Sequence, residues 1–166
     1  MINRRLLLTG VGSFALLAGL RWMHAGDAKA DRKYEITKTE AEWRKLLSPA
    51  AFRVLREEGT ERPFTSPLNA EKRKGLFACA GCELPLFASE TKFESGTGWP
   101  SFYRPLGGAI GTTEDRSLFM LRTEVHCRRC GGHQGHVFED GPAPTGLRYC
   151  INGVSLQFIP ASDQPA

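Results

Sequence analysis

The chain opens with an apolar run and then shows two kinds of hydrophobic pattern. Residues 6–20 contain no charged side chain. From residue 31 to about residue 60, apolar residues recur at helical spacing. Beyond residue 60, short apolar runs alternate with turn residues, and most of the 18 glycines and 10 prolines lie there. This change of period predicts short helices followed by a mainly β domain.

The first expected helix begins near residue 39. Thr39 and Glu42 have the spacing of a capping box, in which each satisfies a backbone N–H at the helix start. Trp43, Leu46 and Leu47 follow as an apolar stripe. The pattern therefore predicts an amphipathic helix with one buried face.

A second helix is expected directly after the first. Ser48 suits the N-cap and Pro49 the first helical position. Phe52 and Leu55 lie on one face at this spacing. Gly59 is the residue expected to end the helix.

The rest of the chain is expected to form strands. Leu118, Met120 and Arg122 alternate with their neighbours, as on a strand buried mainly on one face or partly on both. We expect a mainly β domain, a small barrel or sandwich, with the helices at its N-terminus. The predicted strands span residues 76–78, 117–125, 135–138, 147–151 and 155–159.

Four of the five cysteines form two Cys-x-x-Cys pairs. One motif contains Cys79 and Cys82, and the other contains Cys127 and Cys130. Residues 83–126 separate the two motifs. Four thiolates in tetrahedral geometry make a closed structural zinc site without an open position for chemistry. Iron also fits four thiolates, and two disulfide bridges are the alternative use of these cysteines.

The fifth cysteine, Cys150, has no partner left. A leftover thiol in an exported protein is either inert in the core or reactive, and the residues alone leave both open. Taken singly, the other candidate site residues are also ambiguous between a structural and a functional role. Trp99 by itself is more typical of a core residue, and Asn152 with Gly153 is first of all a turn signal.

The N-terminus has the features of an export signal. Arg4 and Arg5 precede the apolar run, which is shorter than the roughly 20 residues of a membrane span. Residues 28–30 provide a small-x-small cleavage site, so a mature chain would begin at Asp31. We expect a twin-arginine signal over residues 1–30, the twin-arginine machinery as a partner, and a periplasmic domain over 31–166. An uncleaved anchor and an ordinary secretory signal are the alternatives.

The charge of the expected mature chain is nearly balanced. The first 30 residues hold 4 of the 22 Lys and Arg residues and 1 of the 18 Asp and Glu residues. This leaves 18 basic and 17 acidic residues, a net charge of +1. A near-neutral chain without a basic stripe argues against nucleic acid as a partner and against a zinc-ribbon binding module. Nothing in the sequence requires more than a monomer.

Four segments together resemble one known family. They read C-A-G-C-E-L-P-L-F, K-F-E-S-G-T-G-W-P-S-F, E-V-H-C-R-R-C-G-G-H-Q-G-H-V-F-E-D-G-P and P-T-G-L-R-Y-C-I-N. In this order they resemble the peptide-methionine (R)-S-oxide reductases of the MsrB family, over residues 34–160. The resemblance implies two antiparallel sheets, with a structural zinc remote from the active site. It also implies repair of oxidised proteins, or reduction of free methionine sulfoxide.

The resemblance also implies a set of reacting residues. Cys150 would attack the sulfoxide sulfur, methionine would leave, and the cysteine would become a sulfenic acid. His133 and His136 would bind the sulfoxide oxygen or deliver its proton. Asn152 would hydrogen-bond nearby. A lowered pKa of the Cys150 thiol is expected, from Arg148 and the two histidines.

Further residues follow from the same resemblance. Asp140 would orient Arg148 or a histidine. Trp99 would pack against the sulfoxide methyl group, with Phe138 helping to line a pocket that accepts the R epimer alone.

One position departs from a common pattern of this family. Many members carry a resolving cysteine two residues before the tryptophan, and this chain has Thr97 there. With four cysteines committed to zinc, no thiol remains to form an intramolecular disulfide with Cys150. We therefore expect the sulfenic acid to be reduced directly by an external thiol, from a thioredoxin-like protein or a small molecule.

Overall fold

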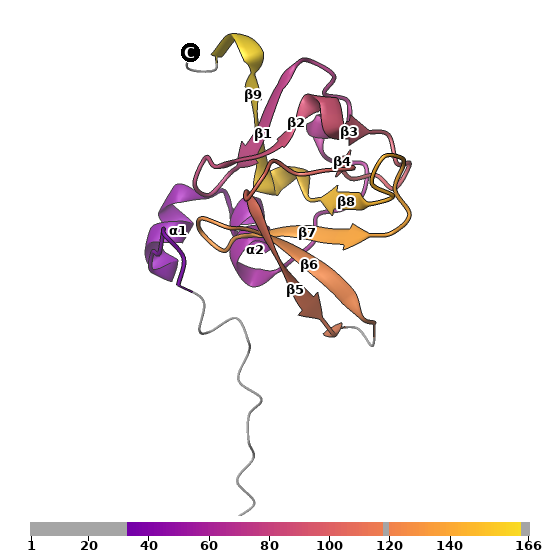
Figure 1. Ribbon diagram of the computed structural model, residues 1–166. Helices are drawn as coiled ribbons and strands as arrows, with labels where there is room; N and C mark the ends of the chain where they lie inside the picture. The colour runs from indigo at the N-terminus through magenta and orange to yellow at the C-terminus, as the bar shows by residue number, and fades with distance from the viewer. Residues whose placement is uncertain (1–32, 118–119, 164–166) are drawn as a thin grey trace, which may run out of the picture. The chain divides into compact units, whose positions relative to one another are not determined.

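The computed structural model describes residues 33–117 and 120–163 (Figure 1). Within these residues two short helices precede the strands. The helices are α1 (Glu40–Leu46) and α2 (Pro49–Glu57). The strands are β1 (Gly75–Cys79), β2 (Pro85–Ala88), β3 (Lys92–Phe93), β4 (Ser101–Phe102), β5 (Ile110–Asp115), β6 (Arg122–Cys127), β7 (His133–Phe138), β8 (Arg148–Ile151) and β9 (Leu156–Pro160).

The predicted export signal over residues 1–30 lies outside the described residues. In the part of the chain that the structure describes, no helix is long and apolar enough to span a membrane.

Both helix starts have the predicted caps. The Thr39 side chain accepts from the backbone N–H of Glu42, whose carboxylate accepts from the backbone N–H of Thr39. The Ser48 side chain accepts from the N–H of Ala51. The predicted end of α2 is off by one residue, because Glu58 rather than Gly59 takes the left-handed conformation, with φ of 57°.

One residue of the predicted helical stripe is exposed. Trp43 and Leu47 are buried, but the Leu46 side chain is 56% exposed. The first helix ends at Leu46, and the chain turns extended at Leu47. The buried face of so short a helix therefore consists mainly of Trp43.

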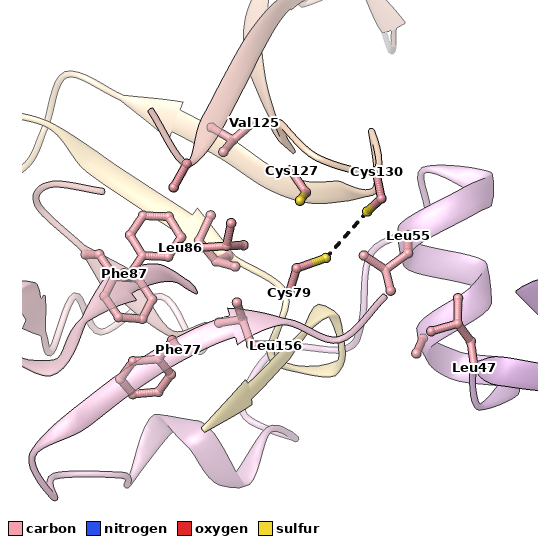
Figure 2. Close-up of a cluster of buried hydrophobic side chains, with 14 of the residues drawn as sticks. Leu47, Leu55, Phe77, Cys79, Leu86, Phe87, Val125, Cys127, Cys130 and Leu156 are labelled. Atoms are coloured by element: carbon pink, nitrogen blue, oxygen red, sulfur yellow. Dashed lines mark hydrogen bonds between the residues drawn. The ribbon is translucent and has the colours of Figure 1, made fainter. Parts of the chain in front are cut away.

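The strands form two antiparallel sheets, as predicted. One sheet has three strands in the order β2-β1-β9, and the other has six in the order β3-β4-β8-β7-β6-β5. Phe102 of β4 joins the sheets, with its ring 4.4 Å from Phe87 of β2 and 5.0 Å from Phe77 of β1. Figure 2 shows Phe77 and Phe87 in this core, with Leu55 of α2 beside the cysteines at one end.

Two features of the sheets differ from the sequence prediction. The strand expected over residues 117–125 begins only at Arg122, and Met120 and Leu121 are 51% and 69% exposed. Residues 118 and 119 lie outside the described part. Strands β2 to β5 were not predicted. They are short or partly exposed, so their hydrophobic pattern is weak.

The six-stranded sheet places Cys150 between two strands. Cys150 of β8 is opposite Ser101 of β4 on one side and opposite His136 of β7 on the other. Gly135 makes the close approach of β7 and β8 possible, because a side chain there would overlap the Cys150 carbonyl.

Candidate active site

Four cysteines meet where two turns approach each other. Cys79 ends β1 and Cys127 ends β6, and each is followed by a turn that carries the second cysteine of its pair. The Sγ atoms of Cys79 and Cys130 are 3.7 Å apart and those of Cys82 and Cys127 are 3.5 Å apart. Figure 2 shows the Cys79 and Cys130 thiols facing each other.

This cluster fits a tetrahedral metal ion. All four Sγ atoms lie within 4.8 Å of one another, and a Zn–S bond of about 2.3 Å places tetrahedral sulfurs about 3.8 Å apart. Hydrogen bonds among the thiols raise the pKa of Cys79 and Cys130 and lower that of Cys82 and Cys127. Four thiols so close together can all be ionised at the same time only if a cation balances their negative charges. A bound zinc ion would supply that positive charge.

Gln134 links this cluster to a second group of predicted residues. Its buried side chain donates to Cys79 Sγ at 3.4 Å and to the Gly132 carbonyl. The backbone carbonyl of Gln134 accepts from both the backbone N–H and the side-chain Nδ2 of Asn152. Gln134 thus joins the metal cluster, through its side chain, to the segment after β8, through its backbone carbonyl.

A pocket of about 130 Å³, open to solvent, lies over the Cys150 side of the six-stranded sheet. It brings together five of the predicted site residues: Trp99, His136, Phe138, Cys150 and Asn152. Thr60, Arg122 and Gly135 complete the lining. His133, Asp140 and Arg148 are not among the lining residues.

The Cys150 thiol is half-buried and its pKa is higher than that of an ordinary cysteine. Burial raises the pKa, while a hydrogen bond with Thr97 and the charge of Arg148 oppose this only in part. The Thr97 Oγ1 and Cys150 Sγ atoms are 3.9 Å apart. The lowering expected from the sequence is therefore wrong in direction, and the thiol keeps its proton at neutral pH.

His136 is held by a carboxylate that the sequence analysis did not identify. Its Nε2 lies 2.7 Å from Asp115 Oδ2, and the same oxygen accepts from Arg122 at 2.6 Å. Burial raises the pKa of Asp115, but hydrogen bonds from Ser117 and His136 outweigh it and hold the pKa well below its ordinary value. Asp115 is therefore ionised and only accepts.

The protonation of His136 follows from this pairing. Burial lowers its pKa, and the bond to Asp115 opposes the shift only in part, so the ring is neutral near pH 7. A neutral imidazole carries one hydrogen, and an ionised Asp115 requires that hydrogen on Nε2. Nδ1 is then the ring atom with a lone pair, suited to accept a proton.

His133 lies in the sheet next to His136. The two rings meet edge to face at 5.4 Å, and only 2% of His133 is exposed. Its Nδ1 is 2.9 Å from Glu124 Oε1, while its buried Nε2 has no hydrogen-bond partner among the described residues. The two histidines therefore differ: His136 lines the pocket, and His133 packs against it from the interior.

Arg148 and Asp140 form a fork-like ion pair. Nε and Nη2 of Arg148 donate to the two carboxylate oxygens of Asp140, each at 2.9 Å. The guanidinium also lies 4.4 Å from the ring centre of Phe138. Of the two partners considered for Asp140, the structure places it with Arg148 rather than with a histidine. The hydrogen bond from Arg148 lowers the pKa of Asp140.

Trp99 and Asn152 have their polar groups bonded within the protein. The indole Nε1 donates to the carbonyl of Glu61 at 3.1 Å. Asn152 Oδ1 accepts from the backbone N–H of Glu61 at 2.9 Å, and its Nδ2 donates to the Gln134 carbonyl at 2.9 Å. Both pocket residues are therefore fixed by the same short segment before β1.

Sequence reasoning missed Thr60, Asp115, Arg122, Glu124 and Gly135. Arg122 and Glu124 alternate on one strand, a signal that two charges share a buried face. Nothing local in the sequence indicates that Asp115 reaches His136, since 21 positions separate them.

Comparison with known proteins adds independent evidence. The family model described as the SelR domain matches residues 47–160. A protein of Methanosarcina barkeri named "Peptide methionine sulfoxide reductase MsrB" is 59% identical over 124 residues, which are 74% of this chain and 87% of that protein. Proteins of the same name are 58% identical in Pseudomonas putida and 54% identical in Agrobacterium fabrum. Each match spans 76% of this chain and, respectively, 96% and 94% of the relative.

Proposed function

Because this chain belongs to the MsrB family of peptide methionine sulfoxide reductases, we propose that Cys150 is the nucleophile of that reaction. The enzyme reduces methionine sulfoxide to methionine and so repairs oxidised proteins. The observation that carries the assignment is the position of Cys150, a thiol in an open pocket whose hydrogen-bonding neighbours are already oriented. The other four cysteines are gathered in the metal cluster.

In the proposed first step, the sulfur of Cys150 attacks the sulfoxide sulfur. The thiol proton passes through Nδ1 of His136 to the sulfoxide oxygen. That oxygen is transferred with its proton to the Cys150 sulfur, and methionine leaves. One thiol and one sulfoxide thus give one sulfenic acid and one thioether, so the cysteine is oxidised as the methionine is reduced.

The raised pKa of Cys150 fits this proton transfer. A thiol that keeps its proton brings that proton to the reaction, and His136 is neutral and able to accept it. Asp115 and Glu124 hold the two histidines in fixed orientations. The Arg148 charge, anchored by Asp140, stabilises the thiolate as it forms.

The pocket walls support selection of the R epimer. Among the lining residues, Trp99 and Phe138 offer apolar surfaces for the sulfoxide methyl group, and His136 offers a polar group for its oxygen. A chiral sulfoxide presents methyl, oxygen and chain in a fixed hand, so one arrangement of walls accepts one epimer.

The metal cluster is proposed to hold a structural zinc ion. Bound zinc would neutralise the thiolates of Cys79, Cys82, Cys127 and Cys130 and tie β1 to β6. The cluster has no open ligand position, so we assign it to stability and to no step of the reaction.

Regeneration is proposed to need an external thiol. The Thr97 hydroxyl lies 3.9 Å from Cys150 Sγ, where a second thiol would act, and a hydroxyl cannot form a disulfide. Two equivalents of a small thiol, or one thioredoxin-like dithiol, would reduce the sulfenic acid to the thiol and release water.

We also propose that residues 1–30 direct export by the twin-arginine route, with cleavage before Asp31. The paired arginines, the short apolar run and the small residues at 28 and 30 support this. Cell fractionation and N-terminal sequencing of the recovered protein test it. A cytoplasmic protein that still begins at Met1 would contradict the proposal.

The proposed function is tested by a single turnover without reductant. The mature protein is mixed with separate R and S epimers of a methionine sulfoxide peptide and a sulfenic-acid trap. We expect one equivalent of methionine from the R epimer alone, with the trap on Cys150. A Cys150→Ser variant is the control. Release of methionine by that variant, or none by the folded wild-type enzyme, would refute the assignment.

A further inference from the structure

The segment between α2 and the 3-10 helix η1 (Pro67–Asn69) crosses close to the pocket. We refer to residues 60–64 as the strap. Thr60 at its start lines the pocket. Phe64 at its end has φ of 65° and donates its backbone N–H to the Gly98 carbonyl at 2.7 Å. The strap is thus fixed to the loop that carries Trp99.

Glu61 makes four hydrogen bonds from the middle of the strap. Its carbonyl accepts from the Trp99 indole, and its N–H donates to Asn152 Oδ1. Its carboxylate accepts from the backbone N–H groups of Gly153 and Val154. These two residues begin the 3-10 helix η4 (Gly153–Ser155).

The carboxylate bonds are the ones that the Glu61 side chain controls. They satisfy two N–H groups at the start of η4, directly after Asn152 and two residues beyond the Cys150–Ile151 end of β8. Charge-assisted bonds of this kind are stronger than neutral ones. A side chain at Gly153 would overlap Ser66, two residues beyond the strap, and would lie 3.3 Å from the Glu61 carboxylate, so the turn packs closely against this segment.

We propose that Glu61 is a positioning residue of this reductase. The Glu61 carboxylate binds the turn after Asn152. This contact holds the Glu61 backbone in the place where it hydrogen-bonds both the Trp99 indole and the Asn152 amide. Glu61 therefore determines the shape of the wall against which the sulfoxide methyl group packs. It acts on substrate binding and epimer choice and leaves the reactivity of the Cys150 thiol unchanged. The inference rests on the proposed function of the pocket.

The test compares Glu61→Gln and Glu61→Ala with wild type. Glu90→Ala is the matched control, because it removes an exposed carboxylate that is not part of the pocket lining. Glu61→Ala loses both carboxylate bonds, and we expect KM for the R-sulfoxide peptide to rise about tenfold or more, with a smaller change in kcat. Glu61→Gln keeps one acceptor oxygen and should lie between Glu61→Ala and wild type.

Two readouts separate positioning from loss of structure. The alkylation rate of Cys150 by iodoacetamide should stay within about twofold of wild type, since that thiol's neighbours are intact. Acrylamide quenching of indole fluorescence should increase, because the Trp99 ring is released. The inference would be overturned if KM and the quenching of indole fluorescence are unchanged in Glu61→Ala. It would also be overturned if Cys150 is alkylated faster and kcat falls in proportion. The quenching measurement needs no turnover, so it distinguishes this failure from a failure of the proposed reaction.

Discussion

Replacing Thr97 by cysteine should give this enzyme an internal resolving thiol. Thr97 Oγ1 and Cys150 Sγ are 3.9 Å apart, whereas an S–S bond is about 2.05 Å long, so two sulfurs would have to approach by about 1.9 Å. Side-chain rotation and a small loop shift can supply that movement. A thiol tethered so close acts at an effective concentration of about 1 mM or more. In reductant-free buffer, the lifetime of the sulfenic acid should therefore be shorter than in the Thr97→Ser control by a factor of about ten or more.

The assay is a single turnover followed by intact-mass measurement and thiol counting on zinc-loaded protein. Thr97→Cys should release one equivalent of methionine, lose two free thiols and no longer react with a sulfenic-acid trap. Thr97→Ser should release the same methionine and keep a trappable sulfenic acid. Methionine release without a disulfide in a folded Thr97→Cys variant would refute the geometry of the pocket. A disulfide in wild type with zinc retained would refute the one-cysteine cycle.

Three further outcomes are expected. Cys127→Ser should lose the metal and unfold at a clearly lower temperature, as measured by metal analysis and thermal melting; a stable, fully loaded variant would mean that the four-cysteine site is misassigned. Asp115→Asn removes the charged partner whose hydrogen bond raises the pKa of His136, so the acidic limb of the pH profile of kcat/KM should move to lower pH and its plateau should fall. An unchanged pH profile would mean that Asp115 and His136 take no part in the mechanism. Arg148→Met removes a charge that lowers the pKa of Cys150, so the pH profile of Cys150 alkylation should move to higher pH, and a shift to lower pH would contradict the assigned role.

The sequence predicted the helices and the metal cluster well because their signals are local. A capping box spans three residues, and a Cys-x-x-Cys pair already contains its turn. The prediction that Leu46 is buried failed because α1 ends at that residue. Of the strand expected over 117–125, the described residues before Arg122 are not in a strand, and the apolar alternation there includes exposed positions such as Leu121.

The site was predictable only in part, because its remaining contacts join distant segments. Asp115 reaches His136 across two strand pairings, and Glu61 reaches Gly153 from a loop more than ninety positions earlier. The pKa of Cys150 was predicted in the wrong direction. A sequence shows which charged groups are available, but the burial that outweighs Arg148 depends on the packed structure.

The place of Cys150 in the middle of its sheet has a kinetic consequence. Strand β8 is hydrogen-bonded on both sides, to β4 and β7, which holds the backbone of Cys150 in place, so the proposed sulfenic acid would meet its reductant in the pocket. In the proposed cycle, reductant and sulfoxide would therefore use the same entrance in turn, and methionine would leave before a thiol enters. Double-reciprocal plots of rate against sulfoxide at several thiol concentrations should then be parallel, the pattern of a ping-pong enzyme. At high concentration the sulfoxide should compete with the reductant that regenerates the enzyme.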